Sequence, residues 1–190
     1  MASLINTFVP SNIYNTLPLI AQVASAPEDH VEYLQDLREL LSKHKVPHGV
    51  SIRLIHKHFN TTEGEVMVFN KLAVPGYGDV QIMKPIVPPN NNQLRGIHYF
   101  VNEHASLQAY EYGNYEVPDM NGFEPFLTEF CSLVSQRGLQ HVFGLKLQHE
   151  DDTDRTGWTE YELHEKRGTI MFPDGMPMPD GNSDYSITTE

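Results

Sequence analysis

Cysteine is nearly missing from this chain of 190 residues, with Cys131 as the single example. One thiol excludes an intramolecular disulfide, and its place on the apolar side of a helical pattern predicts that it packs as a small hydrophobe. Basic residues are also scarce, because 13 Lys and Arg face 25 Asp and Glu for a formal net charge of -12. This balance argues against nucleic acid and anionic membrane surfaces as partners, since both need a basic face.

Long apolar runs are missing as well, and no stretch approaches the length that spans a bilayer. The first basic residue is Arg38, so the N-terminal region has neither the positive start of a secretory signal nor the arginines of a transit peptide. We therefore expect a cytoplasmic protein. Glycine-rich phosphate loops, a nucleophile elbow and kinase motifs are absent too, which disfavours nucleotide-dependent chemistry.

The length is typical of a single domain with a sizeable core. We expect an N-terminal arm at 1–24, one α+β domain at 25–172, and a C-terminal tail at 173–190 that is acidic and rich in Pro and Gly. Two stretches have the spacing of amphipathic helices. The first starts at Ser25, carries Val31 on its apolar stripe and stops at Pro47, and the second runs from Asn121 to Gly138.

Alternating apolar and polar residues predict strands at 49–59, 65–70, 97–103, 107–112, 142–149, 158–164 and 169–172. We expect the first two of these to form a hairpin. Segment 73–96 is rich in Pro, Gly and Asn and is expected to be a long loop with one short strand at 80–83, of a kind that often serves as a lid. Together these helices and strands predict an α+β fold, with a mostly antiparallel sheet and two main helices on one face.

Two distant stretches look like copies of one helix-then-strand unit. In the first copy the shared positions are Leu40, Ser42, His48, Leu54 and His56, and in the second they are Leu133, Ser135, His141, Leu147 and His149. A true internal repeat would place a pseudo-twofold axis that brings His56 and His149 toward a shared centre. The alternative is chance likeness, because any amphipathic helix that leads into an apolar strand gives a similar pattern.

The sharpest local motif is His56-Lys57-His58, followed by Glu63. Imidazoles at i and i+2 on a strand point the same way, and a carboxylate from the next turn completes a set of two His and one acid that suits Fe or Zn. This spacing resembles the first motif of the cupins, which implies a metal ion held inside a small β-barrel by His56, His58 and Glu63. The chain has no glycine six residues after Glu63 and no Pro-x-Gly-x-x-His motif, so a cupin-like barrel with added helices is the alternative fold.

In the second copy, His149 and Asp151 occupy the positions of His56 and His58. The candidate metal ligands are therefore His56, His58, Glu63, His149 and Asp151. The competing interpretation is that these histidines sit at strand ends, where they are solvated or hydrogen-bonded to backbone carbonyls.

Other polar side chains are candidates for a pocket wall. One strand places four residues on the same face: His98, Phe100, Asn102 and His104. We take His98 and His104 as candidate catalytic residues beside His56 and His58. Candidate substrate-binding residues are Asn102, Tyr110, Tyr112 and Arg53. The alternative is that these side chains lie on a solvent-exposed face of the sheet or pack at its edge, which would give the same pattern.

Glu160, Glu162 and His164 alternate on a later strand, and an acid and an imidazole two residues apart would form a proton-transferring pair if buried. An exposed face is the stronger expectation for them, because buried carboxylates are rare. Together these features favour an enzyme for a small organic molecule, an oxygenase, lyase or isomerase that uses a divalent metal. The alternatives are a metal-free acid–base isomerase, dehydratase or cyclase, and a non-catalytic protein that binds a small-molecule ligand or forms a homodimer.

Overall fold

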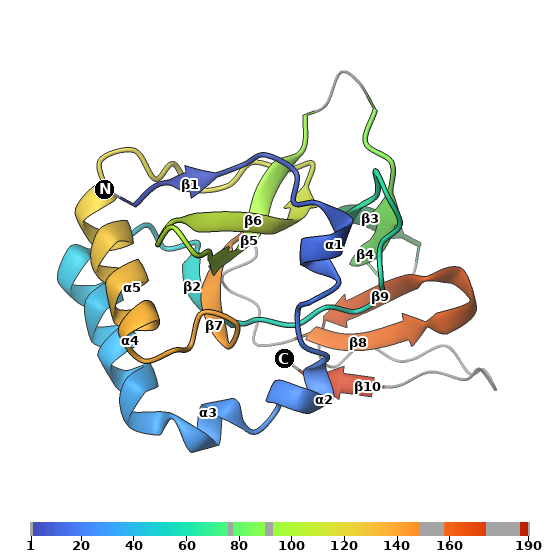
Figure 1. Ribbon diagram of the computed structural model, residues 1–190. Helices are drawn as coiled ribbons and strands as arrows, with labels where there is room; N and C mark the ends of the chain where they lie inside the picture. Colours follow the sequence, from blue (N-terminus) through green and yellow to red (C-terminus); the bar gives the residue numbers. More distant parts are fainter. Residues whose placement is uncertain (1, 76–77, 90–92, 149–157, 174–186, 190) are drawn as a thin grey trace.

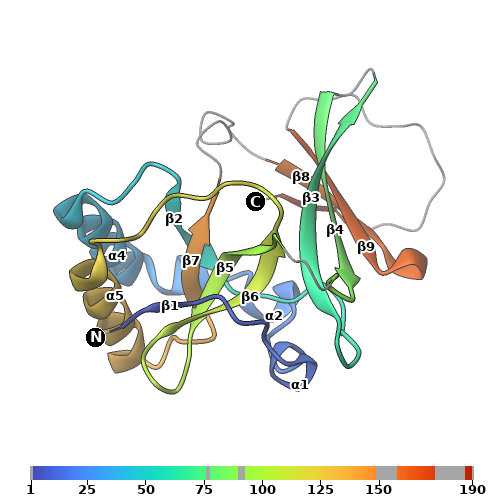
Figure 2. The same cartoon turned by 90° about the horizontal axis from the view of Figure 1, so that it is seen from above.

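The computed structural model describes residues 2–75, 78–89, 93–148, 158–173 and 187–189 (Figure 1). The strands in this part of the chain are β1 (Leu4–Ile5), β2 (Val50–Leu54), β3 (Val66–Val74), β4 (Gly78–Ile86), β5 (Arg95–Val101), β6 (Leu107–Gly113), β7 (Phe143–Leu147), β8 (Trp158–Leu163), β9 (Gly168–Pro173) and β10 (Ile187–Thr189). They form one sheet in the order β10-β8-β9-β4-β3-β6-β5-β7-β2, and β1 pairs with β6 beside this path. The sheet curls into a half-barrel, so that β8 and β9 face β5 and β7 across its concave side (Figure 2).

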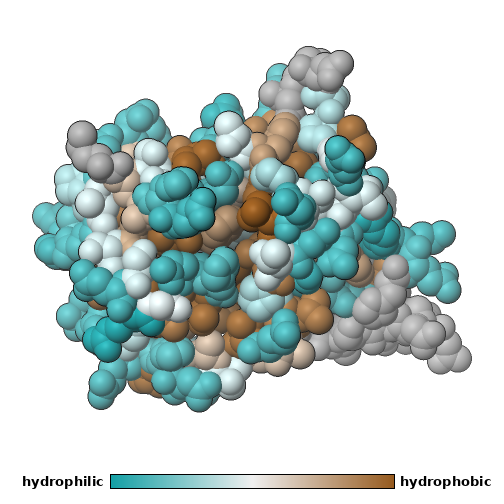
Figure 3. Space-filling view, viewed as in Figure 1, coloured by the Kyte–Doolittle hydropathy of each residue, from teal (hydrophilic) through white to brown (hydrophobic). Residues whose placement is uncertain are grey.

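The described helices are α1 (Ser11–Tyr14), α2 (Ile20–Val23), α3 (Ala26–Asp29), α4 (Val31–His44), α5 (Glu124–Gln136) and the short 3-10 helix η2 (His164–Lys166). The two long ones, α4 and α5, lie side by side on the outer face of the sheet, next to β2 and β7 (Figures 1 and 2). None of these helices has both the length and the apolar character of a membrane-crossing helix. On the surface seen in Figure 3, hydrophilic side chains separate the apolar ones into patches.

Among the described residues, two large apolar cores lie on the two sides of the curled sheet, and a third, smaller cluster consists of Val80, Tyr161 and Phe172. The outer core joins Leu37 of α4 and Phe130 of α5 to sheet residues such as Leu145. The inner core fills the concave side and includes Tyr14, Met67, Phe69, Met83 and Met171. Because both faces are covered, polar side chains on the inner face are removed from water as well.

The predicted α+β class with helices on one face of the sheet is confirmed in this coarse form. The helix at 121–138 and the β5–β6 hairpin are also found. The sheet is more mixed than expected, because β6 runs parallel to both β1 and β3. The predicted arm contributes to the fold directly, since Val9, Tyr14 and Leu17 are buried in the inner core.

The predicted hairpin between 49–59 and 65–70 is wrong. β2 ends at Leu54 and pairs with β7, whereas β3 pairs with β4 on one side and β6 on the other. The turn at 60–64 therefore connects distant parts of the sheet. Alternation identifies the strands here, but it carries no information about which strand is the partner.

The predicted long loop at 73–96 is also wrong, because most of it is strand. β4 spans nine residues and pairs with β3 along the whole length of both strands. Pro85 suggested a loop, yet it lies beyond Gln81–Met83, the only stretch of β4 that also pairs with β9. A proline is tolerated where the strand has an open side, because no ladder hydrogen bond is lost there.

The first predicted helix is divided in two at His30, whose backbone leaves the helical region (φ -129°, ψ 34°). The buried stripe of α4 consists of Tyr33, Leu37 and Leu40, whereas Val31 is 64% exposed. The predicted stripe, which contains Val31, and the observed buried stripe both have helical spacing. The large aromatic side chain decides between them, since Tyr33 packs against Phe143 of β7.

The internal repeat remains a prediction, and one feature agrees with it. β2 and β7 pair antiparallel with Ile52 opposite Leu145, which are equivalent positions in the two copies. Such pairing sends the residues that follow the two strands in opposite directions. Ile55 lies beside Val142 at one end of the ribbon and Gln148 beside Gly49 at the other. The pairing therefore does not support the expected convergence of His56 with His149, a residue that lies outside the described ones.

Candidate metal centre

His56 and His58 reach the concave side because the chain leaves the sheet after β2 in an extended form. The Lys57 N–H donates to the Pro18 carbonyl at 2.8 Å, and Lys57 forms a β-bridge with Leu19. This contact with the N-terminal segment holds 56–58 extended, so that alternate side chains point the same way. His56 is 2% exposed and His58 is 8% exposed.

Glu160 comes from β8, close to the other end of the sheet. It lies opposite Met171 of β9, and Glu162 lies opposite Thr169, so all four side chains share the inner face. Glu160 is only 2% exposed, and the expected solvent-exposed face at Glu160 and Glu162 is therefore wrong. The curl of the sheet covers this face and brings Glu160 to the two histidines.

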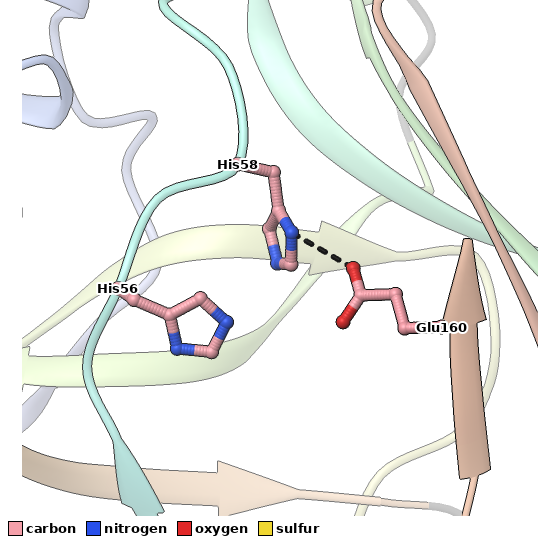
Figure 4. A group of neighbouring side chains, drawn as sticks. All are labelled: His56, His58 and Glu160. Atoms are coloured by element: carbon pink, nitrogen blue, oxygen red, sulfur yellow. Dashed lines mark ion pairs between the residues drawn. The ribbon is translucent and has the colours of Figure 1, made fainter. Parts of the chain in front are cut away.

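His56, His58 and Glu160 form a buried group in which one potential ligand atom from each residue lies within 4.8 Å of the others. Figure 4 shows the three side chains converging, with His58 Nδ1 and Glu160 Oε1 separated by 2.8 Å. Two imidazoles and one carboxylate are the donors that Zn and non-haem Fe prefer. This group could hold a metal ion.

A backbone hydrogen bond orients the His56 ring. Its Nδ1 lies 3.1 Å from the Leu54 carbonyl oxygen, which can only accept, so Nδ1 carries the proton and donates. In the neutral ring the lone pair is then on Nε2, the nitrogen that Figure 4 shows on the side of His58 and Glu160. Metal-binding histidines in proteins commonly have such a bond at their second nitrogen.

Buried polar atoms without a hydrogen-bond partner concentrate on this inner face. Among the described residues there are four such side-chain atoms, of which His58 Nε2, Glu160 Oε1 and Thr169 Oγ1 lie here and Tyr33 Oη lies elsewhere. The Glu160 oxygen is close enough to His58 for an ion pair but is not aligned as a hydrogen bond. Unsatisfied buried groups are costly, so their concentration here is compatible with a site that binds an ion or a water molecule.

The charge of His58 is set by its carboxylate neighbours. Burial opposes a charged ring, but Glu160 and Glu162 more than offset this effect and raise the pKa of His58 from 6.5 to about 10. Without a cation the ring is therefore an imidazolium at neutral pH. A metal ion bound at this ring would take the place of its proton.

A second buried polar group, formed by Tyr14, Arg53, His98 and Glu111, lies behind the three residues. The pairing of β5 with β6 shifts register on either side of His98, and such bulges redirect side chains. His98 Nδ1 lies 2.5 Å from Glu111, whose carboxylate also accepts from Tyr14 at 3.4 Å and lies 3.9 Å from Arg53. Burial, together with Arg53 and Lys146, holds the pKa of His98 well below its usual value, so this ring is neutral and donates to Glu111.

The expected carboxylate ligand Glu63 is exposed in the turn before β3 and is not part of the buried group. The neighbouring Glu65 binds Arg167 at 2.7 Å instead. Glu160 stands in the place that the sequence analysis gave to Glu63. The other two predicted ligands, His149 and Asp151, lie outside the described residues.

The remaining predicted site residues separate into two groups. Arg53, His98 and Tyr110 belong to the buried polar interior, where Arg53 Nε donates to the Tyr110 hydroxyl at 3.3 Å. Asn102 and His104 lie in the β5–β6 turn, where the Asn102 side-chain oxygen accepts the backbone N–H of His104 at 3.0 Å. Tyr112 belongs to neither group, because its buried hydroxyl accepts from the Val9 N–H at 2.8 Å and so ties down the N-terminal segment.

Sequence reasoning missed Glu111, Tyr14 and Thr169 entirely. Nothing local distinguishes them, because Glu111 lies among tyrosines on a strand and its burial follows from the bulge. The alternation of Glu160 with apolar residues was a usable signal, and its weak point was the assumption that the charged face is solvated.

A surface pocket of about 500 Å³ opens beside His56. We call it the β2 pocket, and it is lined by Ile20, Ala24, Pro27, Glu28, Ser51, Ile52, Arg53, Leu54, His56, Lys146 and Gln148. Its volume lies within the range of small-molecule sites.

Fold and site together define an α+β protein with a curled sheet, whose concave side carries a His/Glu cluster able to hold a metal ion. In comparisons with protein-family models, curated proteins and solved structures, the chain matches none of them.

Proposed function

We propose that this chain is an enzyme for a small organic molecule and that it uses a divalent metal ion, Fe or Zn, held by His56, His58 and Glu160. The observation that carries the proposal is the buried group of three donors in which His58 Nε2 has no hydrogen-bond partner. A purely structural histidine pair in a core would have both ring nitrogens satisfied. Three protein ligands also leave coordination positions for a substrate, as in catalytic metal sites.

When bound, the metal would supply Lewis acidity toward a substrate oxygen or activate water or dioxygen. Residues of the chain orient the candidate ligands and exclude water from them. The Leu54 carbonyl holds His56 in one tautomer, and Met67 and Phe69 exclude water from the inner face. Neutral His98 and its partner Glu111 fix the polar interior behind the centre.

Metal analysis of the untagged protein tests this proposal. We expect about one equivalent of Fe or Zn per chain, retained through gel filtration, and at least a tenfold loss of affinity in His58→Ala, about the effect of removing a metal-supporting group. His104→Ala is the matched control, because its side chain is 80% exposed and lies outside the cluster. Substoichiometric metal that His56→Ala and His58→Ala leave unchanged would remove the proposal.

One observation favours a second candidate, acid–base catalysis without metal. The His58–Glu160 ion pair and the His58 pKa of about 10 provide a proton donor beside a carboxylate at neutral pH. Such a site suits an isomerase, dehydratase or cyclase. Once a substrate is found, full turnover after removal of metal by a strong chelator would favour this candidate, whereas loss and recovery on adding metal back would favour the first.

A further inference from the structure

We infer that Thr169 is a further binding residue of the candidate centre, and that its hydroxyl holds the oxygen atom of a substrate that is a small alcohol or carbonyl compound. The inference rests on the proposed function, because that oxygen is the group that would reach a metal ion held by His56, His58 and Glu160. Thr169 is 0% exposed, and its Oγ1 atom has no hydrogen-bond partner among the described residues.

The register of the sheet places Thr169 on the same face as the carboxylate of the centre. Thr169 of β9 lies directly opposite Glu162 of β8, and Glu160 is two residues earlier on β8. Opposite side chains of an antiparallel pair share a face, and diagonal neighbours are roughly 7–8 Å apart. The next residue of β9, Ile170, instead packs against the third, smaller apolar cluster on the opposite face.

His58 lies in front of this part of the β8–β9 ribbon. Its Nδ1 is 2.8 Å from Glu160 Oε1 and 3.8 Å from Glu162 Oε1. These two β8 residues are the diagonal and the direct neighbour of Thr169. An oxygen ligand lies about 2 Å from a metal ion and about 2.8 Å from a hydroxyl that binds it, so that one such atom spans about 5 Å. Directly opposite Cβ atoms are separated by a similar distance, about 4.5–5.5 Å, which puts an ion at His58 within reach of the Thr169 hydroxyl through one oxygen atom.

Two methionines adjoin Thr169 on this face and give its hydroxyl no strong partner. Met83 lies opposite it on β4, Met171 is two residues further along β9, and both side chains are buried. A thioether sulfur is only a weak acceptor. Thr61, by contrast, is buried with its hydroxyl donating to Asn15 Oδ1 at 3.4 Å. A buried hydroxyl without a partner is costly, so threonine at 169, where valine would fill the same volume, fits a residue that binds a group from outside the chain.

The surroundings of Thr169 indicate which oxygen group it binds. A threonine hydroxyl can donate and accept, so it suits both a hydroxyl and a carbonyl oxygen. Phosphate and carboxylate groups are bound in proteins mainly by arginine and lysine. The sheet neighbours of Thr169 are Met83, Met171 and Glu162, and none of them is basic. The carboxylate of Glu160 would also repel an anionic group, which favours a neutral alcohol or carbonyl oxygen.

Co²⁺ serves as a probe, because its visible absorption changes when a ligand binds to it. The chain loaded with Co²⁺ is titrated with acetohydroxamic acid, which presents a carbonyl and a hydroxyl oxygen, and with ethanethiol, whose sulfur is a weak acceptor. We expect Thr169→Val to lower the affinity for acetohydroxamic acid about tenfold, because one hydrogen bond to a charged group is worth about that factor. Its affinity for ethanethiol should stay the same. Thr169→Ser retains the hydroxyl and should keep most of the affinity for both probes.

Tyr33→Phe is the matched control, because it removes the other unpartnered buried hydroxyl of the described residues, away from the centre. It should leave both affinities unchanged. Without metal, Thr169→Val and Tyr33→Phe should unfold at no lower urea concentration than the native chain, since neither hydroxyl is bonded within the fold. A clearly lower midpoint for Thr169→Val alone would show that its hydroxyl has a structural partner, and would overturn the inference.

The remaining outcomes separate this inference from the proposed function. A chain that holds Co²⁺ through His58, and binds acetohydroxamic acid equally with and without the Thr169 hydroxyl, would keep the metal centre and overturn the inference. Equal losses for both probes, loss of Co²⁺ itself in Thr169→Val, or no binding of acetohydroxamic acid at about 10 mM would overturn it as well. A native chain that takes up no Co²⁺ would refute the metal centre, and the inference with it.

Discussion

The protonation of one residue, His58, links the charge of the site to its proposed ligand. Burial disfavours the imidazolium, and Glu160 and Glu162 nevertheless raise its pKa to about 10. A folded-state pKa above the unfolded value of 6.5 contributes stability to the metal-free protein that is fully present below pH 6.5. That contribution is lost as the pH rises through about 10.

The same proton controls metal affinity. Because the ring must release it before it can act as a ligand, we expect Zn²⁺ affinity to rise by up to about tenfold per pH unit between pH 6 and 8. Competition with a chromophoric chelator at several pH values measures this slope. An affinity that does not change with pH would mean that His58 is not a ligand.

At the residue scale, the sequence allowed two of the three donors of the centre to be predicted. His56 and His58 are two residues apart on an extended chain, so their common direction follows from local geometry. Glu160 belongs to a distant strand, and only the curl of the sheet brings it to the histidines. The nearer Glu63 seemed the better ligand because sequence distance was the only available guide.

Among the elements, the β5–β7 pair depends on a position where no side chain fits. A Cβ at Gly144 would lie 1.9 Å from the backbone oxygen of Tyr99, and its neighbour Leu145 pairs with Tyr99. The glycine thus allows β5 and β7 to approach, and β5 in turn carries His98.

We therefore expect Gly144→Ala to lower the free energy of unfolding by about 3 kcal/mol or more, since the backbone must shift. Gly168→Ala in β9 is the matched control, because its nearest atom to a new Cβ is 3.5 Å away. Its expected effect is within about 1 kcal/mol. Urea denaturation of both variants measures the difference, and equal values would show that the ribbon accommodates a methyl group.

Strands and helices were predicted well where a periodic pattern was long, as in α5 and in the β5–β6 hairpin. The prediction failed at 73–96, because the Pro and Gly residues that indicate a loop also occur in a strand such as β4. It failed for the partner of β2 for a different reason. Pairing is decided by contacts between segments far apart in the chain, and alternation within one segment does not specify them.

Over the whole molecule, the His58–Glu160 contact joins the two halves of the curled sheet. His58 follows β2, the last strand on one side, and Glu160 lies on β8 near the other. A ligand that binds both halves in the folded chain stabilises the entire fold, by about 2.7 kcal/mol at a hundredfold excess over Kd.

Zn²⁺ at that excess should accordingly raise the melting temperature of the native chain by several degrees in scanning calorimetry, given a chain of this size. Glu160→Gln should abolish the shift. Glu162→Gln should keep most of it, because that side chain is 3.8 Å from His58 and partly exposed. Equal shifts in both variants would place the metal elsewhere.

The α+β class could be predicted because it depends on the count and order of elements, whereas the half-barrel could not, because it depends on strand order and twist.

The origin of the three donors in distant segments has a consequence for biosynthesis. His56 and His58 are synthesised before β3, whereas Glu160 belongs to β8 and is synthesised only after β3 to β7. A nascent polypeptide therefore presents the two imidazoles without the carboxylate until β8 has been made, and only then could all three donors hold a metal ion.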